Sequence, residues 1–173
     1  MPALRKPRSS KGLATFIARV AQSKQAEDIL ILDLSKIDSA PSDFFMICTC
    51  QSDTQVRAVA EAIDVACREI GLRSPKTEGW DSLQWVIVDY FDVVAHVFNR
   101  EARDFYKLDR VWGDAKFSKL EEDGTLTTVK SPKVLKSEAN LEESSKSSVN
   151  STGKVEFDED DFDDEDEDLD DDK

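Results

Sequence analysis

The sequence predicts an α/β fold: a single domain in which a mixed β-sheet is covered by helices, followed by a disordered acidic C-terminal tail. Apolar runs of strand length alternate with segments that repeat apolar residues at helical spacing. This pattern stops after Phe117, which leaves one domain in a chain of 173 residues. Strands and helices in this order require a sheet that is buried on at least one face.

The first 23 residues contain five basic residues and no acidic residue. A serine at position 9 or 10 is a favourable N-cap for a short helix. The apolar residues that follow fall on one face of such a helix: Leu13, Phe16, Ile17 and Val20. This stripe predicts a helix that docks on the domain, whereas the alternative for a basic, acid-free segment is an organellar transit peptide. We expect residues 1–11 to be a basic flexible N-terminus and residues 12–117 to form the domain.

Two apolar runs predict the first strands of the sheet. Residues 28–34 (DILILDL) and residues 44–50 (FFMICTC) each have the length of a buried strand. Between them, residues 39–43 have the composition of a turn. Cys48 and Cys50 share one face of the second strand because side chains alternate. We interpret them as small buried residues, because zinc sites usually add a second Cys pair that this chain lacks.

A helix is predicted after the second strand. Ser52 and Gln55 have the spacing of a capping box, with Ser52 at the N-cap. The apolar residues that follow recur at helical spacing: Val56, Val59, Ala60, Ile63, Cys67 and Ile70. Gly71 is expected to end this helix, because glycine tolerates the positive φ of a C-terminal cap.

The last part of the domain predicts a hairpin and a helix. Residues 72–83 contain a candidate edge strand, and residues 85–89 and 93–98 form two strands joined at Tyr90-Phe91. Asn99 is a favourable N-cap for a final helix. Three residues of this helix are expected to face inward: Phe105, Leu108 and Trp112.

After Phe117 the composition changes. Residues 118–154 are rich in Ser, Lys, Glu and Thr without a lasting period, and residues 155–173 hold fourteen acidic residues and one lysine. About −13 of the net charge of −14 therefore belongs to the tail. Neither segment can bury enough apolar area to offset an ordering cost of about 1–2 kcal/mol per residue. We expect residues 118–173 to be a disordered linker and acidic tail.

Several kinds of chemistry have little support in the sequence. Three cysteines without a signal peptide argue against a disulfide framework and for a reducing compartment. No run approaches the ~18 apolar residues of a membrane span. Residues 24–117 contain seventeen acidic residues against eleven basic ones, which is the wrong sign for contacts with phosphate. His96, the sole histidine, lies in a predicted strand without a nucleophile in any motif, so packing is favoured over catalysis.

Asp89 and Asp92 flank the expected turn. A two-residue loop at Tyr90-Phe91 would set Asp89 opposite Asp92 and Trp85 opposite His96, with all four side chains on one face. Such a group could bind a metal, or it could form an aromatic patch with a polar rim for a protein partner. The second interpretation is favoured, because magnesium sites for phosphoryl transfer normally include a phosphate-binding loop that this sequence lacks.

Two long segments resemble one protein family. They are SDFFMICTCQSDTQVRAVAEAI at residues 42–63 and EGWDSLQWVIVDYFDVVAHVFNREARDFYKLDRVWGDA at residues 78–115. Both resemble the ribosomal silencing factor family, also called Iojap-like proteins, and the resemblance covers roughly residues 12–117. It implies a nucleotidyltransferase-like α/β domain that lacks the catalytic carboxylates and the Gly-Ser loop of true transferases.

The resemblance implies binding rather than catalysis. The expected partner is the large ribosomal subunit, contacted through its protein numbered fourteen, and the expected effect is a steric block of association with the small subunit that represses translation. No catalytic residue, cofactor or metal is implied. By position, the partner-binding residues are Trp85, Asp89, Tyr90 and Asp92. We extend this patch to Phe91 and Val93.

Phe91 departs from the family's pattern, which usually has Gly in D-Y-G-D. Glycine accepts a positive φ at little cost, whereas an aromatic residue is strained there. Either the turn differs in this chain, or Phe91 adopts another geometry and adds an apolar contact. Cys50 also replaces a Gly that is usual after the second strand, and the acidic tail lies outside the family core.

Other interpretations stay open at this stage. The alternative function is a metal-dependent nucleotidyltransferase that uses Asp89 and Asp92. We expect no membrane contact and no direct nucleic-acid binding by the domain, and a homodimer stays open. The expected location is the bacterial cytoplasm, with an organelle as the alternative. The acidic tail is interpreted as a solvated segment, against a role in repelling ribosomal RNA or contacting basic ribosomal proteins.

Overall fold

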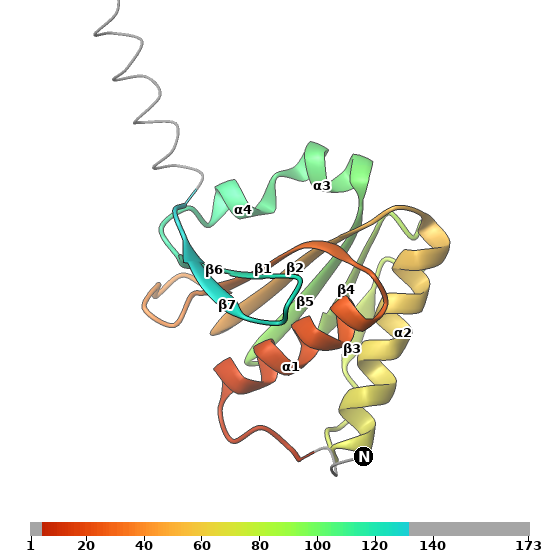
Figure 1. Cartoon of the computed structure of the whole chain (residues 1–173), viewed down its shortest axis with the longest axis horizontal. Helices are drawn as coiled ribbons and strands as arrows, with labels where there is room; N and C mark the ends of the chain where they lie inside the picture. Colours follow the sequence, from red (N-terminus) through yellow and green to blue (C-terminus); the bar gives the residue numbers. More distant parts are fainter. Residues whose placement is uncertain (1–4, 132–173) are drawn as a thin grey trace, which may run out of the picture.

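The computed structural model describes residues 5–131, which form one mixed seven-stranded sheet with helices on both faces (Figure 1). The strand order is β3-β4-β5-β2-β1-β6-β7. The strands are β1 (Glu27–Asp33), β2 (Phe44–Cys50), β3 (Lys76–Glu78), β4 (Trp85–Asp89), β5 (Val93–Asn99), β6 (Lys116–Leu120) and β7 (Leu126–Val129). The helices are α1 (Ser10–Ser23), α2 (Asp53–Glu69), α3 (Arg100–Tyr106) and α4 (Leu108–Val111). The predicted α/β fold is confirmed.

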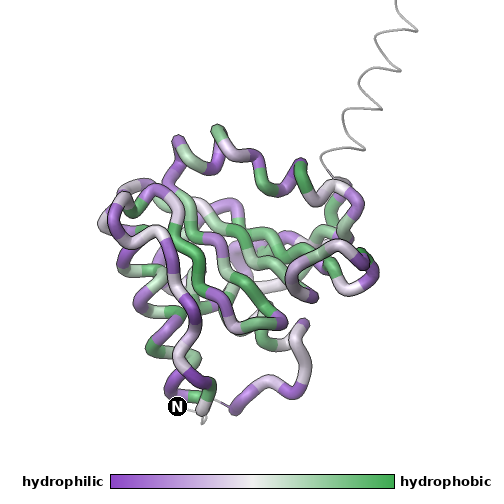
Figure 2. The backbone as a smooth tube through the Cα atoms, turned by 180° about the vertical axis from the view of Figure 1, so that it is seen from behind, coloured by the Kyte–Doolittle hydropathy of each residue, from purple (hydrophilic) through white to green (hydrophobic). Residues whose placement is uncertain are grey.

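Strand β2 lies at the centre of the sheet, and all seven of its residues are buried. It pairs in parallel with β5 and antiparallel with β1. A continuous apolar run is what a strand covered on both faces requires. Figure 2 shows that the most hydrophobic residues are concentrated in these central strands.

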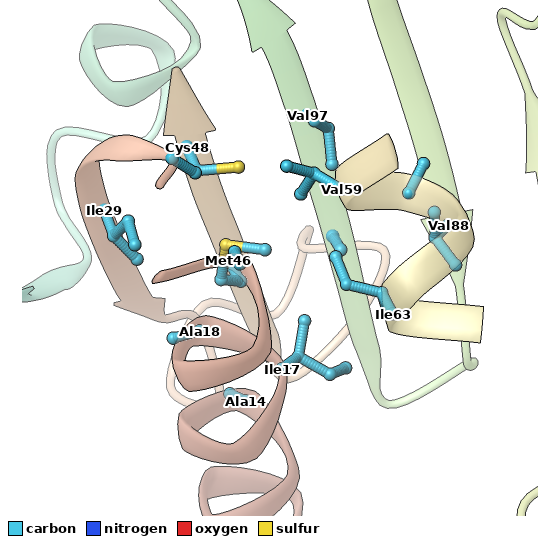
Figure 3. Close-up of a cluster of buried hydrophobic side chains, with 14 of the residues drawn as sticks. Ala14, Ile17, Ala18, Ile29, Met46, Cys48, Val59, Ile63, Val88 and Val97 are labelled. Atoms are coloured by element: carbon cyan, nitrogen blue, oxygen red, sulfur yellow. The ribbon is translucent and has the colours of Figure 1, made fainter. Parts of the chain in front are cut away.

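One core lies between the sheet and helices α1 and α2. Its labelled side chains converge from both helices and from four strands in Figure 3: Ala14, Ile17, Ala18, Ile29, Met46, Cys48, Val59, Ile63, Val88 and Val97. Burying a large aliphatic side chain contributes roughly 1.5–3 kcal/mol. The prediction that the N-terminal helix docks on the domain is confirmed by this core.

Both large helices begin at the predicted caps. The Ser9 Oγ accepts a hydrogen bond from the Gly12 amide at 3.1 Å, so the helix starts inside the segment 1–11 that was expected to be flexible. The Ser52 Oγ accepts from the Gln55 amide at 3.2 Å. Gly71 follows α2 with φ of 83°, as expected for the glycine that ends a helix.

A second core lies on the opposite face of the sheet, beneath α3 and α4. Its largest fully buried side chains are Leu32, Leu34, Ile47, Phe98 and Phe117. Asn99 begins α3 as predicted, because its Oδ1 accepts from the Ala102 amide at 2.8 Å. Leu108 and Trp112 pack against this core as predicted.

The prediction that Phe105 faces inward was wrong, since 78% of its surface is exposed. The expected single helix is divided at Lys107, whose backbone is left-handed with φ of 48° and ψ of 48°. A break of this kind rotates the two helical segments relative to each other. The apolar spacing across it therefore no longer describes one face.

The prediction that residues 118–131 are disordered was also wrong. They continue the sheet as a hairpin in which β6 pairs with β1 and β7 pairs with β6. The side chain of Gln22 in α1 holds the hairpin turn by donating to the Glu121 carbonyl at 2.7 Å. An outer strand needs few apolar residues because most of its side chains meet water, so its composition resembles a linker. Residues 132–173 of the predicted tail lie outside the described residues.

The three cysteines, Cys48, Cys50 and Cys67, are buried free thiols within the first core. The interpretation of Cys48 and Cys50 as small buried residues is confirmed. Among the described helices, none is long and apolar enough to cross a membrane.

Candidate partner-binding surface

The turn between β4 and β5 is formed by Phe91 and Asp92, one residue later than predicted. The Tyr90 amide donates to the Val93 carbonyl at 2.9 Å, which makes these two residues the last pair before the turn. Asp89 therefore pairs with Val94 and not with Asp92.

The predicted strand register was accordingly wrong by two residues, and Trp85 pairs with Phe98 rather than with His96. A shift by two preserves the face on which each side chain lies, whereas a shift by one would have inverted it. The shared face of Trp85, His96 and Asp89 is thus retained, although Trp85 and Asp89 are not directly opposite the residues predicted.

Phe91 occupies the left-handed region with φ of 75°, and 85% of its surface is exposed. Phe91 therefore keeps the positive φ at which an aromatic residue is strained, at a cost of roughly 1–2 kcal/mol, and does not adopt another geometry. The Asp89 Oδ1 accepts from the Phe91 amide at 2.7 Å and fixes the turn. The result is an aromatic ring that projects into solvent from a rigid backbone.

Asp92 links the turn to the rest of the domain. Its carbonyl accepts from the amides of Asp43 and Phe44 at 3.1 and 3.0 Å, which ties the turn to the start of β2. Its Oδ2 accepts from the Ser10 hydroxyl at 3.5 Å, at the start of α1. The Asp92 side chain is exposed, so its carboxylate is available to a partner.

The turn borders a cleft of about 660 Å³. The N-terminal segment and the loop after α2 form its other walls. The charged residues of the lining have both signs: Lys6, Arg8, Arg73, Lys76, Asp89 and Asp92. A surface with mixed charges around an exposed aromatic ring is typical of the rim of a protein interface.

Two residues of the predicted patch point into the domain instead of toward solvent. Val93 is fully buried in the first core, so its side chain is not available to a partner. Tyr90 is half-buried and packs against the same core. Burial raises the pKa of Tyr90 well above its usual value. The side chains of Val93 and Tyr90 thus anchor the turn to the first core.

Trp85 lies at the opposite end of β4 from the turn. It is four residues from Asp89, the last residue of the strand, which corresponds to about 13 Å. Its indole is half-buried, with ring centroids 4.8 Å from Phe98 and 4.9 Å from Tyr106. The indole Nε1 donates to His96 Nδ1 at 3.2 Å. The predicted patch is therefore divided between the turn and an aromatic cluster beside α3.

His96 is a structural residue of this cluster. It is 95% buried, and burial lowers its pKa to about 3. Because Nδ1 accepts the indole proton, the neutral ring carries its own proton on Nε2, which has no partner among residues 5–131. A neutral, enclosed imidazole cannot exchange protons with a substrate, which agrees with the packing interpretation.

The sequence did not predict the exposed apolar residues of α3 and α4. Phe105, Tyr106 and Val111 are 78%, 49% and 63% exposed. Helical spacing suggested burial for Phe105, and no local signal indicated the break at Lys107 that turns it outward.

Comparison with known proteins gives consistent results. A family model described as "Ribosomal silencing factor during starvation" matches residues 7–154. The chain is 42% identical over 113 residues to the ribosomal silencing factor of Bacillus subtilis, covering 65% of this chain and 95% of that protein. It is 35% identical over 113 residues to that of Halalkalibacterium halodurans, covering 65% and 96%. A crystal structure of a Chromobacterium violaceum protein has a TM-score of 0.58 and 31% identity, covering 61% of this chain and 87% of that one.

Proposed function

We propose a function for this chain, which belongs to the ribosomal silencing factor family. It binds the large ribosomal subunit through the ribosomal protein numbered fourteen. The bound domain occupies space that the small subunit needs and so represses translation. It acts as a regulatory protein and not as an enzyme, in the cytoplasm where subunits join. The family match supports this activity, and the exposed, rigid β4–β5 turn supports the location of the contact.

Steric obstruction requires a domain that does not deform when the second subunit approaches. Seven paired strands and two cores support that requirement here. The turn is fixed to this body by three hydrogen bonds, from the amides of Asp43, Phe44 and Phe91. Preorganised contacts of this kind lose little conformational entropy on binding.

We assign the direct contacts to Phe91 and Asp92, with Asp89 and Tyr90 as the residues that hold them. Trp85 contributes at the edge of the surface together with Tyr106. An exposed aromatic ring beside a carboxylate suits a partner with an apolar pocket and a basic rim, because aromatic anchors dominate the energetics of many interfaces.

The test is co-sedimentation with purified large subunits, followed by a subunit-joining assay. Phe91→Ser and Asp92→Lys should each weaken binding at least tenfold, because removing a central interface contact often costs about 2 kcal/mol or more. Both side chains are exposed, so neither change should disturb the fold. Val65→Ser is the matched control, since Val65 is an exposed apolar residue of α2. Unchanged binding of both folded variants would refute the assigned surface.

The alternative nucleotidyltransferase function predicts stabilisation by ATP and Mg²⁺ that is lost in Asp89→Asn. This variant is well suited to the test, because the amide oxygen can still accept from the Phe91 backbone and keep the turn. The structure gives the Asp89 carboxylate a role in the turn. Among residues 5–131, no group of three or more His, Cys, Asp or Glu side chains is arranged to hold a metal ion.

A further inference from the structure

Helices α3 and α4 and strands β1 and β6 enclose a cleft of about 350 Å³ on the face of the sheet opposite α1 and α2. Basic side chains outnumber acidic ones in its lining. The basic residues are Arg100, Arg103, Lys107, Arg110 and Lys119, and the acidic residues are Asp28, Asp104 and Asp109.

The positive charge of this cleft is only partly compensated. Arg100 is paired with Glu27 at 2.7 Å and with Asp28 at 2.9 Å. By contrast, Arg103, Lys107 and Arg110 form no ion pair with a carboxylate within residues 5–131.

Arg103 shows this lack of compensation most clearly. Its Nη1 donates to two neutral oxygens, the Thr49 Oγ1 at 3.1 Å and the Asp28 carbonyl at 3.3 Å. Burial lowers the pKa of Arg103, with nearby Asp109 acting in the opposite direction. A partly desolvated guanidinium without a carboxylate gains energy from an incoming anion.

The same two helices expose apolar side chains. Phe105 and Val111 are 78% and 63% exposed, and Tyr106 is 49% exposed. We call the exposed side of these helices the α3–α4 surface. It comprises the cleft residues Arg103, Lys107 and Arg110 and the exposed residues Phe105 and Val111, which do not line the cleft. A ligand complementary to this surface is acidic and also carries apolar side chains.

The C-terminal residues of this chain have that composition. Residues 155–173 contain fourteen acidic residues and one lysine. Four apolar residues are spaced among the acidic ones: Val155, Phe157, Phe162 and Leu169. The segment therefore matches the α3–α4 surface in both charge and hydrophobicity.

The tail is also attached near this surface. The last described residue, Ser131, donates from its hydroxyl to the carbonyl of Gly113, directly after α4. Figure 1 shows β7 ending beside α4. Residues 132–154 separate this point from the acidic segment, and a chain of that length can reach at most roughly 80 Å. Attachment to the same chain makes the contact intramolecular, so weak contacts suffice.

We propose that residues 155–173 bind in cis to the α3–α4 surface. The acidic side chains contact Arg103, Lys107 and Arg110, and the phenylalanines lie against Phe105 and Val111. This inference does not depend on the proposed ribosomal function.

The test is the radius of gyration of the full chain, measured by small-angle X-ray scattering as salt is raised from about 0.05 to about 1 M. A free acidic tail contracts, because salt screens its self-repulsion. A docked tail is released, because salt weakens its contacts with the basic cleft, and the radius should rise by roughly a quarter. As salt is raised, the radius of gyration therefore falls for a free tail and rises for a docked tail. A constant or falling radius would refute the proposal.

Charge reversal locates the docking surface. Lys107→Glu with Arg110→Glu should give a large radius already at low salt. The control is Lys11→Glu with Arg19→Glu, an equal change of charge on exposed residues of α1 across the sheet, which should behave as the unmodified chain does. Equal behaviour of the cleft and control variants would refute the assignment. If the cleft variant kept a compact radius but lost binding to large subunits, the cleft would belong to ribosomal RNA instead.

A change in the tail itself leaves the domain untouched. Phe157→Ser with Phe162→Ser removes apolar contacts of the tail and leaves the charge of the tail the same. The salt concentration at which the radius of gyration rises should therefore be lower. An unaltered transition would refute the apolar part of the contact.

Measurement over a dilution series separates docking in cis, which is independent of concentration, from docking on a second copy. Loss of compaction on dilution would refute docking in cis.

Discussion

The two ends of β4 hold their aromatic side chains in opposite ways. At the start of the strand, the Trp85 indole lies against Phe98 and Tyr106 and donates a hydrogen bond to His96. Beyond its end, the Phe91 ring is 85% exposed and only its backbone is fixed by the turn. Both residues belong to the patch predicted from sequence. Trp85 contributes to the free energy of unfolding, whereas Phe91 contributes mainly to the free energy of the proposed binding.

The difference determines what a substitution at each end reports. Replacing a half-buried indole changes the free energy of unfolding and any binding energy together. Replacing an exposed ring changes binding with little effect on folding, because surface substitutions are usually within about 0.5 kcal/mol. Binding studies should therefore begin at the turn, and stability studies at Trp85.

The largest effect is expected for Trp85→Ala. The change removes ring contacts with Phe98 and Tyr106 and leaves His96 Nδ1 without its donor, so it should lower the free energy of unfolding by about 3 kcal/mol. Urea denaturation monitored by circular dichroism measures this loss. Val65→Ala, at an exposed position of α2, is the control and should change stability by less than about 0.5 kcal/mol. Similar losses for the two variants would show that the packing of the Trp85 indole does not stabilise the fold.

A second effect concerns pH. The folded protein holds the pKa of His96 near 3, below its ordinary value of 6.5, because burial disfavours the charged ring. The unfolded chain therefore takes up a proton first as pH falls. The stability contribution is complete above about pH 6.5 and is lost progressively toward pH 3. At pH 5 the expected loss is about 2 kcal/mol.

Urea midpoints at pH 7, 6 and 5 measure this dependence. His96→Gln supplies a neutral acceptor for the indole and cannot titrate, so its stability should vary much less over the same range. If the two proteins lost stability in parallel, the acid sensitivity would belong to carboxylates and not to the Trp85 cluster.

The smallest effect is expected for Phe91→Gly, and its sign is opposite to that of Trp85→Ala. Glycine relieves the left-handed strain but adds freedom to the unfolded chain, so the net gain in stability should be about 0.5–1 kcal/mol. Binding to the large subunit should weaken at the same time, because the exposed ring is lost. A loss of stability in thermal or urea unfolding would show that the Phe91 ring contributes to the fold after all.

Much of the candidate surface was predictable from the sequence, because its signals are local. The common face of Trp85, Asp89 and His96 follows from strand alternation. The resemblance to the family marked position 91 as one that usually holds glycine, but it left the geometry of Phe91 open. What the sequence could not supply was the division of the patch. Val93 and Tyr90 face the core because α1 and α2 cover that side of the sheet, which is a long-range arrangement.

By itself, the sequence determined the α/β class, the caps at Ser52 and Asn99, a cap at Ser9 or Ser10, the glycine that ends α2, and the family. Each depends on spacing within one turn or one strand, or on residues matched in order. Tertiary structure decided the hairpin register, the break at Lys107, the outward position of Phe105 and the addition of β6 and β7 to the sheet. These features follow from pairing and packing between segments distant in the chain, and a short sequence window contains no record of which partner covers it.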